Sequence, residues 1–287
     1  MVNAGSEPNP EVSLRVSLLI YILCYDDASE AHARQHFAQY PWARIMRLPT
    51  GVPAAKIMEG QAFEALLTRQ DEWEHVDFVG TLSWRAHEKI RVDLVEASVK
   101  QLRAHDVIAF MPLLAQYDYW ILQTISSHPR FLEIWTPLLV HMGYSIADTV
   151  SVDMPVFFCN YWVATPDRMK SFLRFYTRAL QCLDALPEIQ GALWSDSQHR
   201  GSMMSADALT AVFGRPYMTY HPFLCERLPC FFFWKHRASI ACMPIARTAF
   251  WQGYFRGRYT LLKKSESDID KMCLDPPRSK PVMGDRS

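Results

Sequence analysis

The feature that most constrains the fold is an apolar run at residues 16–25, Val-Ser-Leu-Leu-Ile-Tyr-Ile-Leu-Cys-Tyr. It is rich in β-branched and aromatic residues, and the two acids Asp26 and Asp27 end it. A short, nearly continuous apolar run is typical of a strand that is covered on both faces, as in a parallel sheet. The chain must therefore supply helices for both faces of that sheet.

Segments with strand and helix character alternate after this run. Strands are expected at 43–48, 76–82 and 107–114, and helices at 28–40, 54–70 and 92–103. This alternation predicts βαβ units with right-handed crossovers. We therefore expect an α/β protein with a mostly parallel sheet flanked by helices.

The second half of the chain carries mixed signals. Residues 121–142 have helical character with two interrupting prolines, and 154–164 form an apolar strand with one polar residue, Asn160. A helix is expected from Thr165-Pro166-Asp167 to Leu186, because an N-cap, a first-position proline and an acid precede apolar residues at helical spacing. Beyond Gly191 the sequence is irregular and aromatic, which predicts loops of the kind that carry sites.

These segments predict one catalytic domain at 12–262, with halves at 12–120 and 121–262. Residues 1–11 are a polar lead-in, and 263–287 lose their apolar content, which predicts a disordered tail. Lys and Arg total 30, and so do Asp and Glu. This balance argues against a protein that mainly binds nucleic acid or anionic lipid.

The seven cysteines contain no C-x-x-C pair, and several lie in apolar runs, which favours a reducing compartment. The early apolar run is far shorter than the roughly 20 residues that span a bilayer. We expect a soluble, cytoplasmic protein with no membrane span.

Familiar phosphate-binding motifs are absent from the sequence. It contains neither G-x-x-x-x-G-K-[ST] nor G-x-G-x-x-G, and only 11 glycines, so we expect side chains rather than backbone amides to hold any anion. His32 and His36 lie four residues apart on an expected helix and could form a metal pair. Because the sequence shows no third ligand, a solvated helix face explains both, and no metal site is predicted.

Two clusters follow expected strands of the first half. Tyr25, Asp26 and Asp27 follow the first strand, where open α/β sheets bind ligands, although a helix cap explains the acids equally well. Arg85, His87 and Lys89 follow the third strand. In an extended segment these three cations would point the same way and suit a diphosphate. In a helix Arg85 and Lys89 would still share a face, and an ordinary solvated turn is a further alternative.

A third cluster lies at residues 220–234, where Glu226 and Arg227 stand in apolar sequence. Isolated buried charge is costly, so this pair is expected to be functional or to form a structural buried ion pair. Cys225 and Cys230, with His221 nearby, are interpreted as core cysteines rather than as a nucleophile or zinc site.

The order of these segments resembles that of the glycosyltransferases of capsular polysaccharide synthesis. In that family a Y-I-G-x-x-H-Y-R-R segment, an N-M-F-I segment and an E-R-L segment recur in this order. The counterparts here are residues 78–85, 160–163 and 226–228, within a similarity that covers roughly residues 18–235. The chain is also similar to small glycosyltransferases of large algal viruses, among them a xylosyltransferase.

The resemblance implies a GT-A-like fold, with a Rossmann-type half for a nucleotide-sugar co-substrate and an irregular acceptor half. A UDP-sugar, with UDP-xylose as one candidate, and a glycan hydroxyl acceptor are the implied substrates. Members of that fold commonly hold Mn²⁺ or Mg²⁺ with a D-x-D after a strand. Here Thr81-Leu82-Ser83 stands at that place, and the literal D-x-D, residues 268–270, lies in the expected tail. Metal dependence therefore stays open, with the cations after the third strand as a metal-free alternative.

Position along the chain and the needs of sugar transfer together indicate the expected site residues. The expected donor-binding residues are Tyr25, Asp26, Asp27, Lys56, Thr81, Ser83, Arg85, His87 and Lys89. The acceptor hydroxyl must lose a proton to a base, and the candidates are Asp153, Asp196 and Glu226. The expected acceptor-binding residues are Asn160, Trp162, Trp194, His221 and Arg227. The alternative is a non-catalytic nucleotide- or carbohydrate-binding module that keeps the fold.

Overall fold

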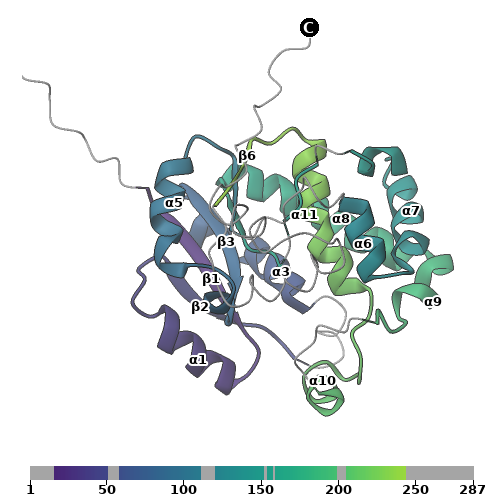
Figure 1. Cartoon of the computed structure of the whole chain (residues 1–287), viewed down its shortest axis with the longest axis horizontal. Coiled ribbons are helices and arrows are strands. Elements are labelled where there is room, and N and C mark those ends of the chain that lie inside the picture. Colours follow the sequence, from purple (N-terminus) through teal and green to yellow (C-terminus); the bar gives the residue numbers. More distant parts are fainter. Residues whose placement is uncertain are drawn as a thin grey trace, which may run out of the picture.

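The computed structural model describes residues 16–50, 58–110, 120–151, 154–157, 159–198 and 205–243. Within them a six-stranded sheet has the order β2-β1-β3-β5-β4-β6 (Figure 1). The strands are β1 (Leu18–Cys24), β2 (Ala43–Arg47), β3 (Phe78–Ser83), β4 (Val107–Ala109), β5 (Trp162–Ala164) and β6 (Ile240–Cys242). β5 runs antiparallel to both of its neighbours, and the other five strands are parallel to one another.

Strand β1 confirms the expectation for the opening apolar run. It pairs in parallel with β2 on one side and β3 on the other, and Ile20, Tyr21 and Ile22 are fully buried. A strand in this position needs apolar side chains on both faces, which explains its lack of alternation. The carboxyl ends of β1 and β3 consequently lie side by side.

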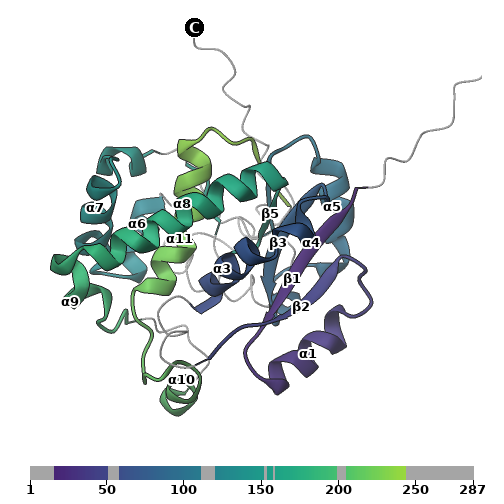
Figure 2. The same cartoon turned by 180° about the vertical axis from the view of Figure 1, so that it is seen from behind.

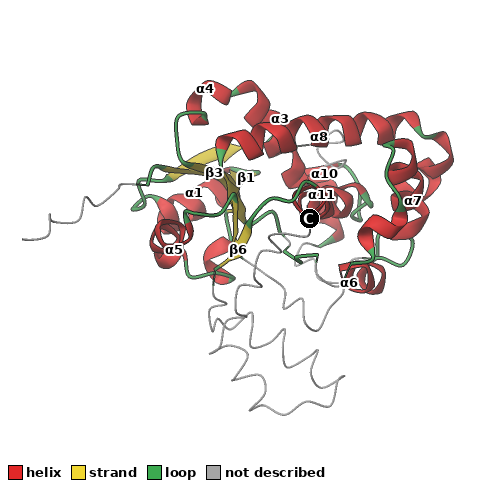
Figure 3. Ribbon diagram, turned by 90° about the horizontal axis from the view of Figure 1, so that it is seen from above, coloured by secondary structure: helices red, strands yellow, loops and turns green. Residues whose placement is uncertain are grey.

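Helices cover both faces of the sheet (Figure 3). On one face lie α1 (Asp27–Phe37) and α5 (Val95–Leu102), and on the other lie α3 (Gln61–Thr68), α4 (Gln70–Trp73) and α8 (Pro166–Ala185). Short 3₁₀ turns are η1 (Met58–Gly60), η2 (Ala86–Glu88), η3 (Val92–Leu94), η4 (Ile146–Thr149) and η5 (Pro187–Ile189). The α/β class with a mostly parallel sheet flanked by helices is therefore confirmed.

The remaining helices gather beside the sheet (Figure 2). They are α6 (Trp120–Ser127), α7 (Phe131–His141), α9 (Gln190–Leu193), α10 (Ala206–Phe213) and α11 (His221–Lys235). Helix α8 begins as expected, with Thr165 at the N-cap and Pro166 in the first turn. Its buried side chains include Phe172 and Tyr176, and both pack against Phe63 of α3.

Several sequence-based expectations were wrong. The expected run of βαβ units is interrupted, because antiparallel β5 lies between β3 and β4. Gly80 permits this insertion, since a Cβ there would lie 2.1 Å from the carbonyl oxygen of Trp162. The expected strand at 154–164 is regular only in its last three residues.

The region beyond Gly191 is also more regular than expected. Residues 206–213 and 221–235 form α10 and α11, although loops were predicted there. Pro137 and Pro229 lie inside α7 and α11, so two prolines that suggest helix ends do not act as such. Tertiary burial of both helices outweighs the hydrogen bond that each proline removes.

The two expected halves share one sheet, because β5 and β6 from the second half pair with β3 and β4 from the first. The lead-in at 1–11 and the expected tail at 263–287 lie outside the described residues. No helix within the described ranges has both the length and the apolar character needed to cross a bilayer.

Candidate functional site

A group of polar side chains gathers where β1 and β3 end. Tyr25 directly follows β1, Ser83 closes β3, and Lys89 follows η2. Other parts of the chain add Glu59 from η1, Cys159 and Tyr161 from the turn before β5, and Glu226 from α11. We call Tyr25, Glu59, Ser83, Lys89, Cys159, Tyr161 and Glu226 the strand-end cluster. Its position agrees with the place where open α/β sheets bind ligands.

Lys89 is the cation of this cluster. Its Nζ lies 3.7 Å from Cys159 Sγ and 5.4 Å from the centroid of the Tyr161 ring. Cys159, followed by Tyr161, Glu59 and Glu226, raises the pKa of Lys89 against the opposing effect of burial. Because burial raises the pKa of the Cys159 thiol to about 12, that thiol is neutral at pH 7, and the two acids supply the negative charge there.

Glu59 and Glu226 differ in their acidity. Burial raises the pKa of Glu59 to about 7, with Glu226 adding to the rise and Lys89 opposing it. Burial would also raise the pKa of Glu226, but Arg227, the Cys159 amide and His128 together hold it below its ordinary value. Two carboxyl groups with separated pKa values are the arrangement that divides acid and base work in an active site.

The buried Glu226–Arg227 ion pair anchors one side of the cluster. Arg227 is only 2% exposed, and its Nε donates to Thr124 Oγ1 at 3.2 Å. Glu226 also accepts a hydrogen bond from the Cys159 amide. The two residues therefore form the structural ion pair that the sequence left as one alternative. The same pair positions the turn that carries Cys159.

That turn has unusual backbone geometry. Cys159 and Asn160 have φ values of 61° and 53°, in the left-handed region that non-glycine residues seldom adopt. The Asn160 carbonyl accepts a hydrogen bond from Thr81 Oγ1 at 3.2 Å, and the next residue, Tyr161, hydrogen-bonds to Ser83. Asn160 Oδ1 is buried and has no hydrogen-bond partner among the described residues. Backbone strain of this kind concentrates at functional sites.

The expected convergence of Arg85, His87 and Lys89 was wrong. The segment forms the 3₁₀ turn η2 rather than an extended strand, so its side chains spread around the turn instead of alternating. Arg85 donates to both carboxylate oxygens of Glu88, at 2.7 and 2.6 Å, while His87 stacks on His36. Only Lys89 of the three lies in the strand-end cluster.

Of the two acids after β1, Asp26 takes the helix-capping role that the sequence left open. Asp26 is the N-cap of α1: its Oδ1 accepts from the Ser29 amide at 2.7 Å, and these hydrogen bonds lower its pKa. Asp27 is exposed and pairs with Arg47 at 2.9 Å. Donor binding by these two acids stays a prediction that their contacts do not support.

Most expected acceptor-binding side chains lie elsewhere. Trp162 is 1% exposed and packs on Phe63 and Phe172 in the core, which leaves no ring face for a sugar. Trp194 and His221 contact each other, with ring centroids 4.5 Å apart. Among the expected bases other than Glu226, the structure describes only Asp196. Asp196 is exposed and caps its own turn by accepting from the Gln198 amide, while Asp153 and Lys56 lie outside the described residues.

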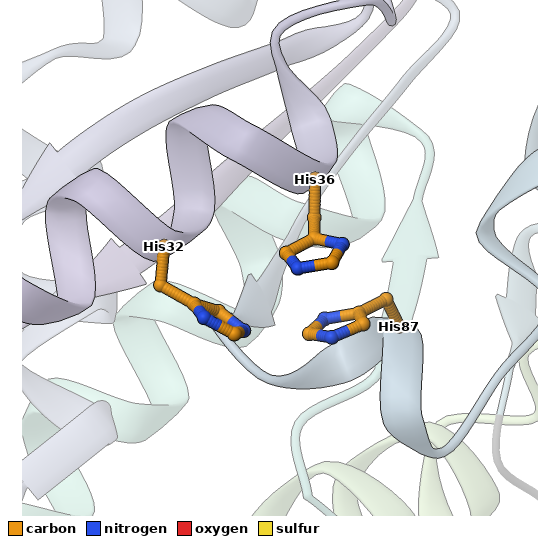
Figure 4. A group of neighbouring side chains, drawn as sticks. All are labelled: His32, His36 and His87. Carbon is orange, nitrogen blue, oxygen red and sulfur yellow. The ribbon is translucent and has the colours of Figure 1, made fainter.

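The carboxylate clamp for a donor metal has no counterpart at the end of β3. Thr81 and Ser83 are buried there, and their hydroxyls hydrogen-bond to protein partners. Among the described residues, the group of side chains suited to a metal is instead His32, His36 and His87 (Figure 4). His87 is thus the third candidate ligand that the sequence did not show beside His32 and His36.

Sequence reasoning missed Glu59, Cys159 and Tyr161. Cys159 and Tyr161 flank Asn160, which the sequence marks as the polar residue of an apolar segment, so their neighbourhood was signalled. Glu59 carries no such signal, because an acid on an expected helix normally faces solvent. Gly60 beside it allows η1 to pack tightly, since a Cβ there would lie 2.3 Å from the Tyr176 hydroxyl.

Comparison of the chain with protein-family models, with curated proteins and with solved structures found no match to any of them.

Proposed function

We propose that the protein is a glycosyltransferase that moves a sugar from a nucleotide-sugar donor to a glycan hydroxyl, on a GT-A-like scaffold. A UDP-sugar is the proposed donor, with UDP-xylose as the first candidate. The proposal joins the resemblance described above to the chemistry of the strand-end cluster. The grouping of Glu59, Lys89 and Glu226 at the ends of parallel strands is the observation that carries it.

Lys89 supplies the positive charge that a departing diphosphate needs. As the bond between the anomeric carbon and the diphosphate oxygen breaks, its electrons pass to the nucleoside diphosphate, where negative charge grows. A cation already held in place stabilises that charge without reorganisation. The hydroxyls of Thr81 and Ser83 at the end of β3 already bond to protein groups, so Lys89 is the proposed partner of the diphosphate there.

Glu59 supplies the base. The acceptor hydroxyl attacks the anomeric carbon and passes its proton to the Glu59 carboxylate. A pKa of about 7 leaves much of this group ionised at neutral pH, yet basic enough to accept a proton. Glu226, with its lowered pKa and its bond to Arg227, stays ionised and keeps Lys89 charged.

Donor binding is the first test. Titration calorimetry of the full chain with UDP should show binding, and Lys89→Met should raise the dissociation constant by about 10-fold to 100-fold, the equivalent of one charge-assisted hydrogen bond. Lys100→Met is the matched control, because Lys100 pairs with Glu96 on α5. Absence of UDP binding at millimolar ligand, with and without Mn²⁺, would contradict the proposal.

Turnover is the second test. With UDP-xylose or UDP-glucose, release of UDP should fall by at least about 100-fold in Glu59→Gln, while UDP affinity is retained. Glu188→Gln, on exposed η5, is the control. Equal turnover in Glu59→Gln and the parent would remove Glu59 from the mechanism.

The alternative is a binding module that keeps the scaffold without the chemistry. Two observations favour this alternative: no D-x-D follows β3, and Asp196, one of the expected bases, is exposed. UDP or glycan binding with no release of UDP from any nucleotide-sugar would establish this alternative.

A further inference from the structure

Three histidines meet on the α1 face of the sheet (Figure 4). His32 and His36 are four residues apart on α1, so they lie on the same side of that helix. His87 comes from η2, more than fifty positions along the chain, and faces them. We call these three residues the histidine trio.

The ligand atoms of the trio are close enough to share one ion. One ring nitrogen from each histidine lies within 4.8 Å of the other two. A tetrahedral zinc ion with bonds of about 2.0–2.1 Å needs nitrogens roughly 3.3 Å apart, so the rings must approach further. The His36 and His87 rings are stacked, with centroids 3.8 Å apart and planes 10° apart, and one of them must turn to aim its nitrogen at the ion. Rotation about the χ2 torsion of histidine is broad and permits this.

Two ring nitrogens of the histidine trio are shielded from water and have no hydrogen-bond partner among the described residues. His87 Nδ1 is one of them, so it has no protein partner to displace before it could bind an ion. His32 Nε2 is shielded from water and has no hydrogen-bond partner within the described part of the chain.

The trio also has an acid nearby. Glu88 lies within electrostatic reach of His87 and His32, and would partly offset the charge of a bound cation. Each of the three histidines is half-buried, so none of them is fully enclosed by the protein. Three protein nitrogens plus one water form the coordination of a zinc site with an open position.

We propose that His32, His36 and His87 bind one Zn²⁺ ion, each through one ring nitrogen, with water as the fourth ligand. Imidazole ligands favour borderline ions such as Zn²⁺, whereas Mg²⁺ and Ca²⁺ prefer oxygen ligands. The ion joins α1 to the turn that also carries Arg85 and Lys89. This inference does not depend on the proposed glycosyl transfer, because it rests on the trio alone.

The experiment uses the full chain without a histidine tag, stripped of metal with a chelator and then dialysed. Titration calorimetry with ZnCl₂ should show one equivalent bound at micromolar affinity or tighter, and no comparable binding of MgCl₂. His36→Gln and His87→Asn should each weaken Zn²⁺ binding by more than about 100-fold, since loss of a ligand exceeds loss of its orienting partner. His141→Gln, at the exposed end of α7, should bind Zn²⁺ as the parent does.

Cobalt substitution identifies the ligands independently of affinity. Co²⁺ bound by the trio should show the visible absorption of a four-coordinate ion without the near-ultraviolet band of a cobalt–thiolate bond. A thiolate band, or Zn²⁺ binding that is unchanged in His36→Gln and His87→Asn, would overturn the proposal. Circular dichroism establishes that both variants fold, and if one does not, the other decides the question.

Discussion

The strand-end cluster and the histidine trio each include a residue of the turn at η2, but their charges are balanced differently. Lys89 enters a cluster that contains Glu59 and Glu226, so its charge is compensated within the protein. His87, two residues earlier, meets two further histidines, and the nearest acid, Glu88, is already engaged by Arg85. The cation of the strand-end cluster therefore already has acidic partners, whereas the histidine trio has ring nitrogens that an added cation could bind. Similar residue types near a strand end therefore do not imply a common role.

The largest expected effect tests whether Glu226 of the strand-end cluster depends on the positive charge of Arg227. Arg227→Met should reduce the free energy of unfolding by about 3–5 kcal/mol, because Glu226 would remain buried without its partner. Arg91→Met is the control, since the Arg91–Asp93 pair is exposed and should contribute less than about 1 kcal/mol. Urea denaturation measures both. Equal losses in the two variants would break the comparison.

A second effect concerns pH. The pKa of Glu59 is about 7 in the folded protein and 4.5 ordinarily, so folding favours its protonated form. The stability it contributes is complete below about pH 4.5 and is lost as pH rises through 7, in total about 3 kcal/mol. Glu59→Gln should remove this loss, so the variant gains stability over the parent as pH rises from 5 to 8.

Urea denaturation at several pH values measures this difference, with Glu188→Gln as the control. Parallel curves for Glu59→Gln and the parent would mean that Glu59 titrates as an exposed acid does. The strand-end cluster would then lack the buried carboxyl that distinguishes it from the trio.

The smallest expected effect concerns α1, the helix that carries two histidines of the trio. Asp26→Ala removes the N-cap of α1, the helix that carries His32 and His36, and should cost about 1 kcal/mol. Asp27→Ala, which removes an exposed ion pair, should cost less. Thermal denaturation measures both costs, and unchanged UDP affinity in the two variants would confine these acids to a structural role. A large loss of UDP affinity in Asp26→Ala would instead restore it as a donor ligand.

The sheet strands of the first half and helix α8 could be predicted because their signals are local. The apolar run of β1 and the Thr165-Pro166 start of α8 each specify an element without reference to the rest of the chain. The position of β5 could not be predicted, because three residues carry no register information and Gly80 shows its purpose only beside Trp162. Helix α11 was not predicted, because buried side chains surround it and its sequence therefore lacks the one-sided apolar spacing of a surface helix.

The residues of the candidate site also divide into those that local sequence signals predict and those that only the folded chain brings together. Lys89, Ser83 and Glu226 were found because they follow a strand or stand in apolar sequence. Glu59 was not found, because its unusual pKa comes from burial that only the folded chain creates. The histidine trio was missed because its third member lies far along the chain and was expected to face elsewhere.

Gly60 has a consequence for how this protein tolerates change. A methyl group at that position would need the space of the Tyr176 hydroxyl and would approach Cys225 to 3.3 Å. Any replacement would push η1 away from α8 and α11, and Glu59 would move with it. A library randomised at residue 60 and selected for transfer should consequently return glycine, although this residue has no side chain with which to take part in the reaction.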